Sequence, residues 1–195
     1  MPAPPRLSSF ETSARRTGPE TTSRTERTMT TEVSVRFVSV DDELAEPLLA
    51  DLEREYDGRY GDFFGEPAST ELRRYPASDF AAPHGAFLVL VVDGRPIAGG
   101  AFRRFDEHTA ELKRVWTHPE HRSQGLGRRV VAELERAAQE RGYRDVTLTT
   151  GPRQPEAVAL YLASGYVPRF DPSRPADEIG IHGFDKHLAA ADVLA

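Results

Sequence analysis

The sequence contains no cysteine, which excludes disulfide bonds, thiolate metal ligands and a cysteine nucleophile. It also lacks a long hydrophobic run, because its longest apolar stretch, residues 86–92, is far shorter than the roughly 20 residues of a membrane-spanning helix. Basic residues are outnumbered by acidic ones, and a formal net charge of −6 does not favour non-specific binding to nucleic acid. No secretory signal pattern is visible. We therefore expect a cytoplasmic protein with neither a nucleic-acid partner nor a membrane anchor.

Large apolar side chains are scarce in the N-terminal segment. Residues 1–31 are rich in Pro, Ser, Thr and Arg, and Leu7 and Phe10 are nearly their only large apolar residues. Such a segment buries too little apolar surface to offset its chain entropy. We therefore predict a disordered tail over residues 1–31, with Met29 as a candidate natural start. The remaining residues, 32–190, are enough for one domain with its own hydrophobic core.

Hydrophobic periodicity predicts alternating strands and helices in this domain. Three strands within residues 87–117 follow one another at short turns, one of them Asp-Gly, and predict an antiparallel meander. The strand at 109–117, the amphipathic helix after it and the strand at 145–150 predict a parallel pair with a right-handed crossover. The predicted strands are residues 33–39, 87–92, 97–105, 109–117, 145–150, 166–170 and 179–186. The first predicted helix is capped by Asp41 or Asp42 and ends at about Tyr56. The other predicted helices are residues 70–75, 124–141 and 155–164.

The most specific pattern lies between the strand at 109–117 and the helix that follows it. The run from Arg122 to Gly127 reads Arg-x-x-Gly-x-Gly and places two glycines at the helix start. A helix N-terminus offers unpaired N–H groups and the positive end of its dipole to an anion, and glycine lets a phosphate approach the backbone. A P-loop is excluded because no G-x-x-x-x-G-K-[ST] run occurs, and a dinucleotide fingerprint would require glycine at Val130. A helix start that binds no ligand remains the alternative.

A second pattern follows one strand later. The run from Gln154 to Tyr166 reads Gln-x-x-Ala-x-x-Leu-Tyr-x-x-x-Gly-Tyr. Together, in this order, the two runs resemble the GNAT superfamily of N-acetyltransferases, and the resemblance covers residues 33–188. Gln154 stands where the family usually has Asn, and Tyr166 stands where it often has Phe. The resemblance implies an α/β fold with a mixed, mostly antiparallel sheet of about six to seven strands, splayed into a V and covered by helices on both faces.

The resemblance also implies the chemistry of the site. Acetyl-CoA is the implied co-substrate, no metal is implied, and a bulge in the strand before the glycine run frees backbone amides for the pantetheine and thioester. Tyr161 is the implied acid toward the departing sulfur, since a phenol is protonated at neutral pH. Glu111, in an Ala-Glu-Leu setting, is the implied base; a structural carboxylate paired with Lys113 or Arg114, or a water chain as base, remains the alternative. The implied cofactor-binding residues are Val115, Trp116, Thr117, Arg122, Ser123, Gln124, Gly125, Leu126, Gly127, Arg128 and Gln154.

The acceptor side has a weaker signature. Residues 56–80 and 170–178 mix aromatic and acidic side chains, which suits a cationic amine held by carboxylates and cation–π contacts. We expect an N-acetyltransferase that moves the acetyl group to a primary amine, on a small-molecule or amino-acid-like acceptor, by direct attack on the thioester. The alternatives are a protein lysine or N-terminal acetyltransferase and a catalytically weak acyl-CoA-binding sensor. The sequence does not determine the oligomeric state, and a homodimer is the candidate assembly because dimers are common among similar proteins.

Overall fold

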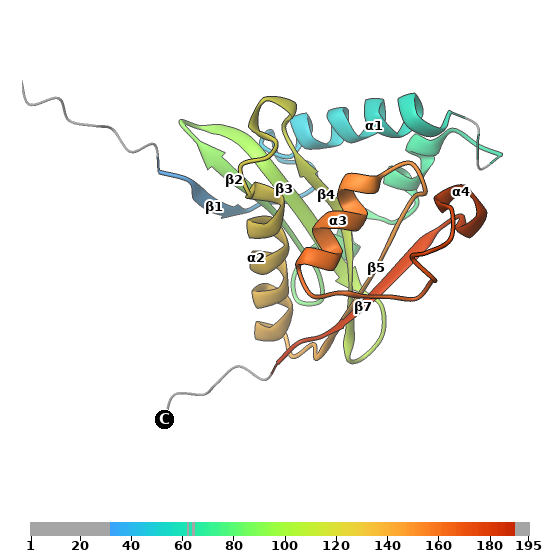
Figure 1. Ribbon diagram of the computed structural model, residues 1–195. Helices are drawn as coiled ribbons and strands as arrows, with labels where there is room; N and C mark the ends of the chain where they lie inside the picture. The colour runs from blue at the N-terminus through green and yellow to red at the C-terminus, as the bar shows by residue number, and fades with distance from the viewer. Residues whose placement is uncertain (1–31, 62, 64, 190–195) are drawn as a thin grey trace, which may run out of the picture. The chain divides into compact units, whose positions relative to one another are not determined.

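The computed structural model describes residues 32–61, 63 and 65–189, and the tail predicted over residues 1–31 lies outside them. The described chain folds into a sheet covered by helices (Figure 1). No helix within these ranges is long and apolar enough to cross a membrane. The elements are β1 (Ser34–Phe37), α1 (Glu46–Tyr60), η1 (Ala68–Arg73), η2 (Ala77–Phe80), β2 (Ala86–Val92), β3 (Arg95–Arg104), β4 (Thr109–Thr117), η3 (Pro119–His121), α2 (Leu126–Glu140), β5 (Asp145–Thr150), α3 (Pro155–Ala163), β6 (Val167–Pro168), α4 (Ala176–Ile179) and β7 (His182–His187).

The sheet has seven strands in the order β1-β2-β3-β4-β5-β7-β6. Strands β2 to β4 form the predicted antiparallel meander, and β4 and β5 form the predicted parallel pair. Strand β1 pairs antiparallel with β2 at the edge of the sheet. Every other pairing is antiparallel, including β5 with β7 and β6 with β7. The mixed, mostly antiparallel α/β architecture expected from the sequence is therefore confirmed.

The sheet opens between β4 and β5. These strands pair from Thr109 and Asp145 only as far as Leu112 and Leu148. Beyond that point β4 continues along β3 to Thr117, while β5 continues along β7 to Thr150. The backbone edges of residues 113–117 and 149–150 are therefore not joined to one another, which is the V expected from the resemblance.

A bulge in β4 lies at the opening. Gly99 pairs with Trp116 and Ala101 pairs with Lys113, so the two residues between them on β4 oppose Gly100 alone. Arg114, the first of these two, has a φ of 59°. A residue with a side chain reaches this left-handed region at a cost of about 1–2 kcal/mol. The interactions of the Arg114 side chain, described below, hold the backbone in this conformation.

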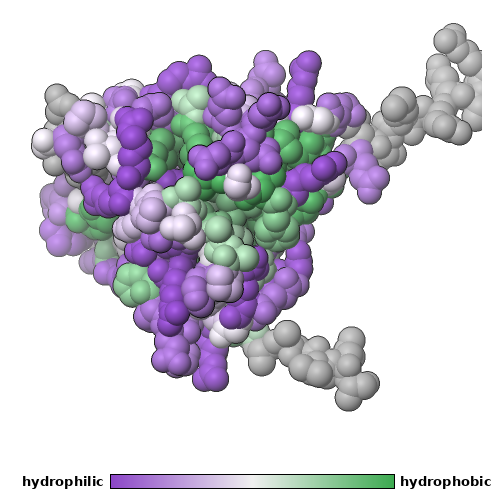
Figure 2. All heavy atoms as spheres, turned by 180° about the vertical axis from the view of Figure 1, so that it is seen from behind, coloured by the Kyte–Doolittle hydropathy of each residue, from purple (hydrophilic) through white to green (hydrophobic). Residues whose placement is uncertain are grey.

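Two apolar clusters pack on the two faces of the sheet (Figure 1). Residues Val130, Leu134 and Tyr161 bring α2 and α3 onto one face, and Leu48, Leu52 and Phe80 bring α1 and η2 onto the other. Figure 2 shows hydrophobic side chains gathered in the middle and upper part of one view, with hydrophilic ones around its margins. Helices thus cover both faces, as expected.

Several predicted boundaries are wrong. Helix α1 begins at Glu46 after an N-cap at Ala45 that has no side-chain cap. Asp42 instead accepts a hydrogen bond from the Leu44 N–H at 2.8 Å in the preceding turn, so neither Asp41 nor Asp42 caps the helix. Pro47 is tolerated because it lies in the first turn, where its missing N–H has no intrahelical partner.

The C-terminal part differs in a similar way. The strand predicted over residues 166–170 is reduced to the two residues of β6, and Ile179, expected to begin a strand, ends α4 instead. Helix α1 also continues to Tyr60, and the following segment contains two 3-10 helices rather than one short helix. These errors fall where local patterns are short and packing decides the conformation.

Candidate functional site

The glycine run forms a concave stretch of backbone at the start of α2. Ser123 has a φ of 61° and Gly125, the N-cap residue, has a φ of 77°. A Cβ added to Gly125 would have no atom within 4 Å, so the space above it is open. The N-cap makes no side-chain hydrogen bond, and the first turn contains no acidic residue. Alternating left-handed residues and an uncapped helix N-terminus turn N–H groups toward one point, which fits a diphosphate.

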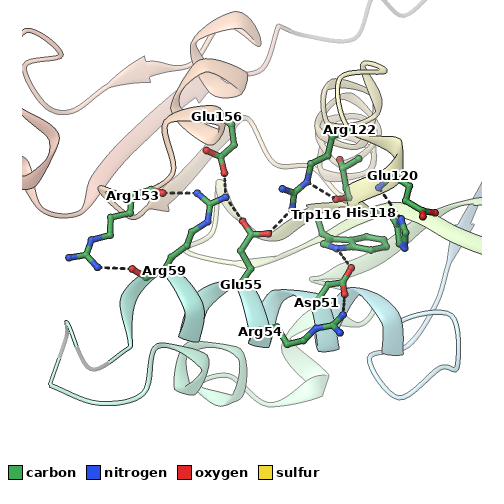
Figure 3. A network of polar contacts seen from close by, with 11 residues as sticks. Asp51, Arg54, Glu55, Arg59, Trp116, His118, Glu120, Arg122, Arg153 and Glu156 are labelled. Carbon is green, nitrogen blue, oxygen red and sulfur yellow. Dashed lines mark hydrogen bonds and ion pairs between the residues drawn. The ribbon is translucent and has the colours of Figure 1, made fainter.

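Arg122 lies beside this stretch and faces helix α1. Its Nη2 atom is 2.8 Å from Oε2 of Glu55, and its Nε donates to the Thr117 carbonyl at 3.4 Å. Figure 3 shows Glu55 between Arg122 and Arg59. Nη2 of Arg59 is 2.9 Å from Oε1 of Glu55, so one carboxylate holds two guanidinium groups. An anion that binds Arg122 must therefore compete with Glu55.

The same network reaches the start of α3. Arg59 also pairs with Glu156, and it donates to the Arg153 carbonyl at 2.6 Å (Figure 3). Burial raises the pKa of the Glu156 carboxyl, but the hydrogen bond with Arg59, a backbone hydrogen bond and the positive charges of Arg59 and Arg122 together outweigh burial and lower the pKa below its usual value. Helix α1 is thus connected to both sides of the V, to the glycine run through Arg122 and to α3 through Glu156.

Gln154 closes the turn between β5 and α3. Its Oε1 atom accepts hydrogen bonds from Thr150 Oγ1 at 2.8 Å and from the Gly151 N–H at 3.2 Å. The Tyr60 hydroxyl lies 2.2 Å from where a Gly151 Cβ would be, so only glycine fits beneath it. The carboxamide oxygen of Gln154 is therefore engaged within the protein, which leaves its amino group as the part that can reach a ligand.

Tyr161 lies on α3 with its ring buried. Its ring centroid is 5.7 Å from that of Tyr166 and 5.7 Å from that of Phe184. Burial raises the pKa of the Tyr161 hydroxyl well above its usual value, and Tyr56 on α1 adds to this effect. Burial likewise raises the pKa of Tyr56, with Glu71 and Glu55 contributing. Both phenols therefore remain protonated, and able to donate, throughout the neutral and mildly alkaline range.

Glu111 is buried on the face of the sheet that α1 covers. Its Oε2 atom is 2.7 Å from Arg103 Nη2, and its Oε1 atom is 3.2 Å from Lys113 Nζ. Oε2 is nevertheless buried without a well-directed hydrogen bond. Lys113 is also 2.7 Å from Glu71 Oε1, and both cations lie over the Tyr75 ring. Glu111 is thus a carboxylate held by two cations, with one oxygen that can still accept a hydrogen bond.

The remaining predicted cofactor residues lie around the opening. Val115, Trp116 and Thr117 form the end of β4 beyond its separation from β5. The Trp116 indole is buried under α1 and donates to Asp51 Oδ2 at 3.2 Å, so this residue offers only its backbone to the V (Figure 3). Leu126 is buried in the core through its side chain. Gln124, Gly127 and Arg128 follow the helix start, where Gln124 and Arg128 are exposed and Gly127 is half-buried.

No group of three or more His, Asp or Glu side chains that could hold a metal ion is present among the described residues. His118 and His121, the one pair with metal-ligand spacing in the glycine loop, have ring centroids 5.7 Å apart, and His118 Nδ1 accepts from the Glu120 N–H. These contacts of His118 and His121 are therefore part of the turn at η3.

The sequence did not indicate the ion pairs and hydrogen bonds that Glu55, Glu71, Arg103 and Arg114 make at the site. Glu55 lies on helix α1 and pairs with Arg122 of the glycine run, 67 positions away. Arg129, in the first turn of α2, donates to the Val33 carbonyl at 3.0 Å. No local pattern distinguishes these charged residues from ordinary surface ones, because their partners come from distant elements.

Comparison with known proteins agrees with this geometry. The model of the "Acetyltransferase (GNAT) family" matches residues 49–166. A crystal structure of a putative acyl-CoA N-acyltransferase from Klebsiella pneumoniae is 28% identical, with a TM-score of 0.59 over 80% of this chain and 98% of that chain. No curated protein sequence matches this chain.

Two more distant structures contain a cofactor. A putative acetyltransferase from Salmonella typhimurium, solved with acetyl-CoA, is 16% identical with a TM-score of 0.59 over 84% of this chain and 97% of that one. An N-acetyltransferase from Thermoplasma acidophilum, solved with coenzyme A, is 16% identical with a TM-score of 0.61 over 80% and 99%. At these identities the likeness concerns the fold.

Proposed function

Because this chain belongs to the GNAT acetyltransferase family, we propose that it is an acetyl-CoA-dependent N-acetyltransferase that acts on a primary amine of a small-molecule or amino-acid-like acceptor. The observation that carries the proposal is the uncapped N-terminus of α2, with no acidic residue in its first turn and with open space above Gly125, at the point where β4 leaves β5. That arrangement supplies N–H donors to a diphosphate and leaves a free strand edge beside it.

The residues of the opening fit acetyl-CoA. Backbone N–H groups from Ser123 to Arg128 would hold its diphosphate, with Arg122 adding charge. The free edge of β4 at residues 115–117 would hold its pantetheine, and Gln154 would reach it from the opposite side. When bound, acetyl-CoA supplies an acetyl thioester, and donors aimed at the carbonyl oxygen stabilise the charge that develops there.

Two proton transfers are assigned to side chains. An ammonium ion has no lone pair, so the acceptor must lose a proton before its nitrogen attacks the thioester carbon. We assign the removal of this proton to Glu111, whose Oε2 lacks a well-directed hydrogen bond. We assign protonation of the departing sulfur to Tyr161, whose raised pKa keeps the phenol protonated. Each such transfer typically contributes about 10²–10⁴-fold to the rate.

The experiment has two parts. Calorimetry with CoA and with acetyl-CoA measures binding, and release of CoA in the presence of a panel of primary amines measures transfer. We expect micromolar binding and transfer to at least one amine, and Arg122→Met should weaken binding without lowering the thermal midpoint. Absence of binding by the folded protein would refute the proposal. Tight binding without transfer to any small amine or lysine peptide would instead indicate an acyl-CoA sensor.

A further inference from the structure

Arg114 is a buried guanidinium without an acidic partner. Only 7% of the residue is exposed. Its Nη2 atom donates to the Leu72 carbonyl at 2.5 Å, and its guanidinium carbon lies 4.0 Å from the centroid of the Phe80 ring. Nη1 is buried with no hydrogen-bond partner. Among the described residues no carboxylate forms an ion pair with it, although a buried arginine is normally paired.

The other buried cations in the layer of side chains between the sheet and the helices α1 and η1 do have acidic partners. Arg103 and Lys113, also on the strands beneath α1 and η1, are each paired with Glu111. Glu71, the nearest additional acid, uses one oxygen for Lys113 and the other for Arg74. Burial lowers the pKa of the Arg114 guanidinium, and the partly opposing influence of Tyr56 and Glu71 does not restore it. Among the described residues, Arg114 is therefore the buried cation of this layer that has no ion pair with a carboxylate.

Arg114 also lies where an acceptor has to bind. It occupies the bulge of β4, three residues after Glu111 and directly before the strand edge assigned to the thioester. Tyr56 lies near enough to influence the pKa of both Arg114 and Tyr161. Arg114 thus borders the place at which amine and thioester would meet. Its left-handed backbone is of the kind that persists at functional sites.

We propose that Arg114 binds an acidic group of the acceptor, so that the substrate is an amine that carries a carboxylate. This inference rests on the proposed acetyltransferase function. A guanidinium presents parallel N–H donors that match a carboxylate, and the free Nη1 supplies the missing one. The amine end then points toward Glu111, and Phe80 and Tyr56 contact the carbon skeleton. Leu72 and Phe80, both in segment 68–80, contact the Arg114 guanidinium, so we expect this segment to shift when the acceptor binds.

The test compares amines that differ only in the acidic group. Acetyl transfer is measured for phenylalanine against phenethylamine, for leucine against 3-methylbutylamine, and for ω-amino acids of increasing length against the corresponding alkylamines. We expect kcat/KM to be about 10- to 100-fold higher for the best carboxylate-bearing amine than for its counterpart, because a hydrogen bond to a charged group contributes this much. This comparison uses the wild-type protein and needs no variant.

Variants then test whether Arg114 is the source of the preference for carboxylate-bearing amines. Arg114→Met should abolish the preference, mainly by raising KM for the carboxylate-bearing amine, and Arg114→Lys should restore part of it. Arg141→Met is the matched control, since Arg141 also lies over an aromatic ring, 5.4 Å from the Phe102 centroid, and donates to a backbone carbonyl, that of Ala137. It should leave the preference intact. Calorimetry with the deaminated acid of the best substrate should show binding to the wild type and at least tenfold weaker binding to Arg114→Lys.

The outcomes separate the two proposals. Equal kcat/KM for amines with and without the carboxylate, in a protein that transfers acetyl groups, would overturn the role of Arg114 and leave the acetyltransferase function standing. A preference that survives Arg114→Met would do the same. Failure to bind CoA, or to acetylate any amine, would instead remove the function itself and this inference with it.

Discussion

The two sides of the V are built in different ways. The glycine run is one continuous stretch of chain, from η3 into α2, whose useful groups are backbone N–H donors. The side that we assign to the acceptor combines α1, the 3-10 helices, β3 and β4, and the groups we assign there are side chains such as Glu111, Arg114 and Tyr56. A backbone site is specified by local conformation, whereas a side-chain site exists only after distant elements pack together.

The difference extends to electrostatics. Beside the glycine run Glu55 pairs with Arg122, and the first turn of α2 contains no acidic residue. On the acceptor side acids and bases alternate within a buried layer, and most are paired. Substitutions should therefore act mainly on cofactor affinity on one side and mainly on turnover or acceptor KM on the other.

The largest expected effect is that of Tyr161→Phe. Removing the phenol that we assign to the departing sulfur should lower kcat about 10²- to 10³-fold, within the range typical of general acids. The affinity for acetyl-CoA should stay within twofold, since the ring and its packing remain. Stopped-flow or steady-state CoA release, together with calorimetry, measures both quantities. Unchanged turnover would show that another group, or water, protonates the sulfur.

Glu111→Gln should lower kcat/KM about 10- to 100-fold, because the amide cannot accept the amine proton. Glu135→Gln is the matched control, since Glu135 is partly buried and, like Glu111, paired with a lysine, Lys186 at 2.7 Å, but lies on α2 away from the V. Steady-state kcat/KM of both variants with the best acceptor decides the question. A Glu111→Gln variant that keeps the wild-type kcat/KM would assign the base elsewhere.

A smaller effect is expected from Glu55→Gln. Loss of this carboxylate frees Arg122 and removes a negative charge beside the diphosphate site, so CoA should bind about three- to tenfold more tightly at low salt. The gain should shrink as ionic strength rises, because Arg122 is partly exposed. Glu53→Gln, on the same helix but paired with Arg73, should leave CoA affinity unchanged. Weaker CoA binding in Glu55→Gln would show that the network serves to position Arg122 rather than to compete for it.

The smallest effect concerns alkaline pH. Burial raises the pKa of Tyr56, Tyr161 and Tyr166 above the value of about 10 that they have in the unfolded chain. Above that pH the unfolded chain loses protons that the folded one retains, so the contribution of these tyrosines to the free energy of unfolding should be constant below about pH 10 and fall as the pH rises further. Phenolate absorbance of folded and denatured protein at about pH 10.5 checks this: the folded protein should show clearly less. Equal absorbance would mean that these hydroxyls reach solvent.

Much of the cofactor side could be predicted from the sequence. Gly125 and Gly127 at a helix start after an apolar strand, and the helix pattern around Tyr161, identify the family because each depends on residues close in the chain. The acceptor side could not be read in this way. Nothing local indicates that Glu71 reaches Lys113, or that Arg114 lies under Phe80, since these contacts span more than 30 positions.

By itself the sequence determined where the strands of the meander lie, where helix α2 begins to within about two residues, and which family the chain belongs to, because turn residues, hydrophobic period and glycine positions act through neighbours along the chain. Only the tertiary structure decided that Glu55 holds Arg122, that Glu111 is shared by two cations and that Arg114 forms no ion pair within the described part of the chain. The physical reason is that the strength and the partner of a charge depend on burial and on distance in space, and both are set when α1 packs across the sheet.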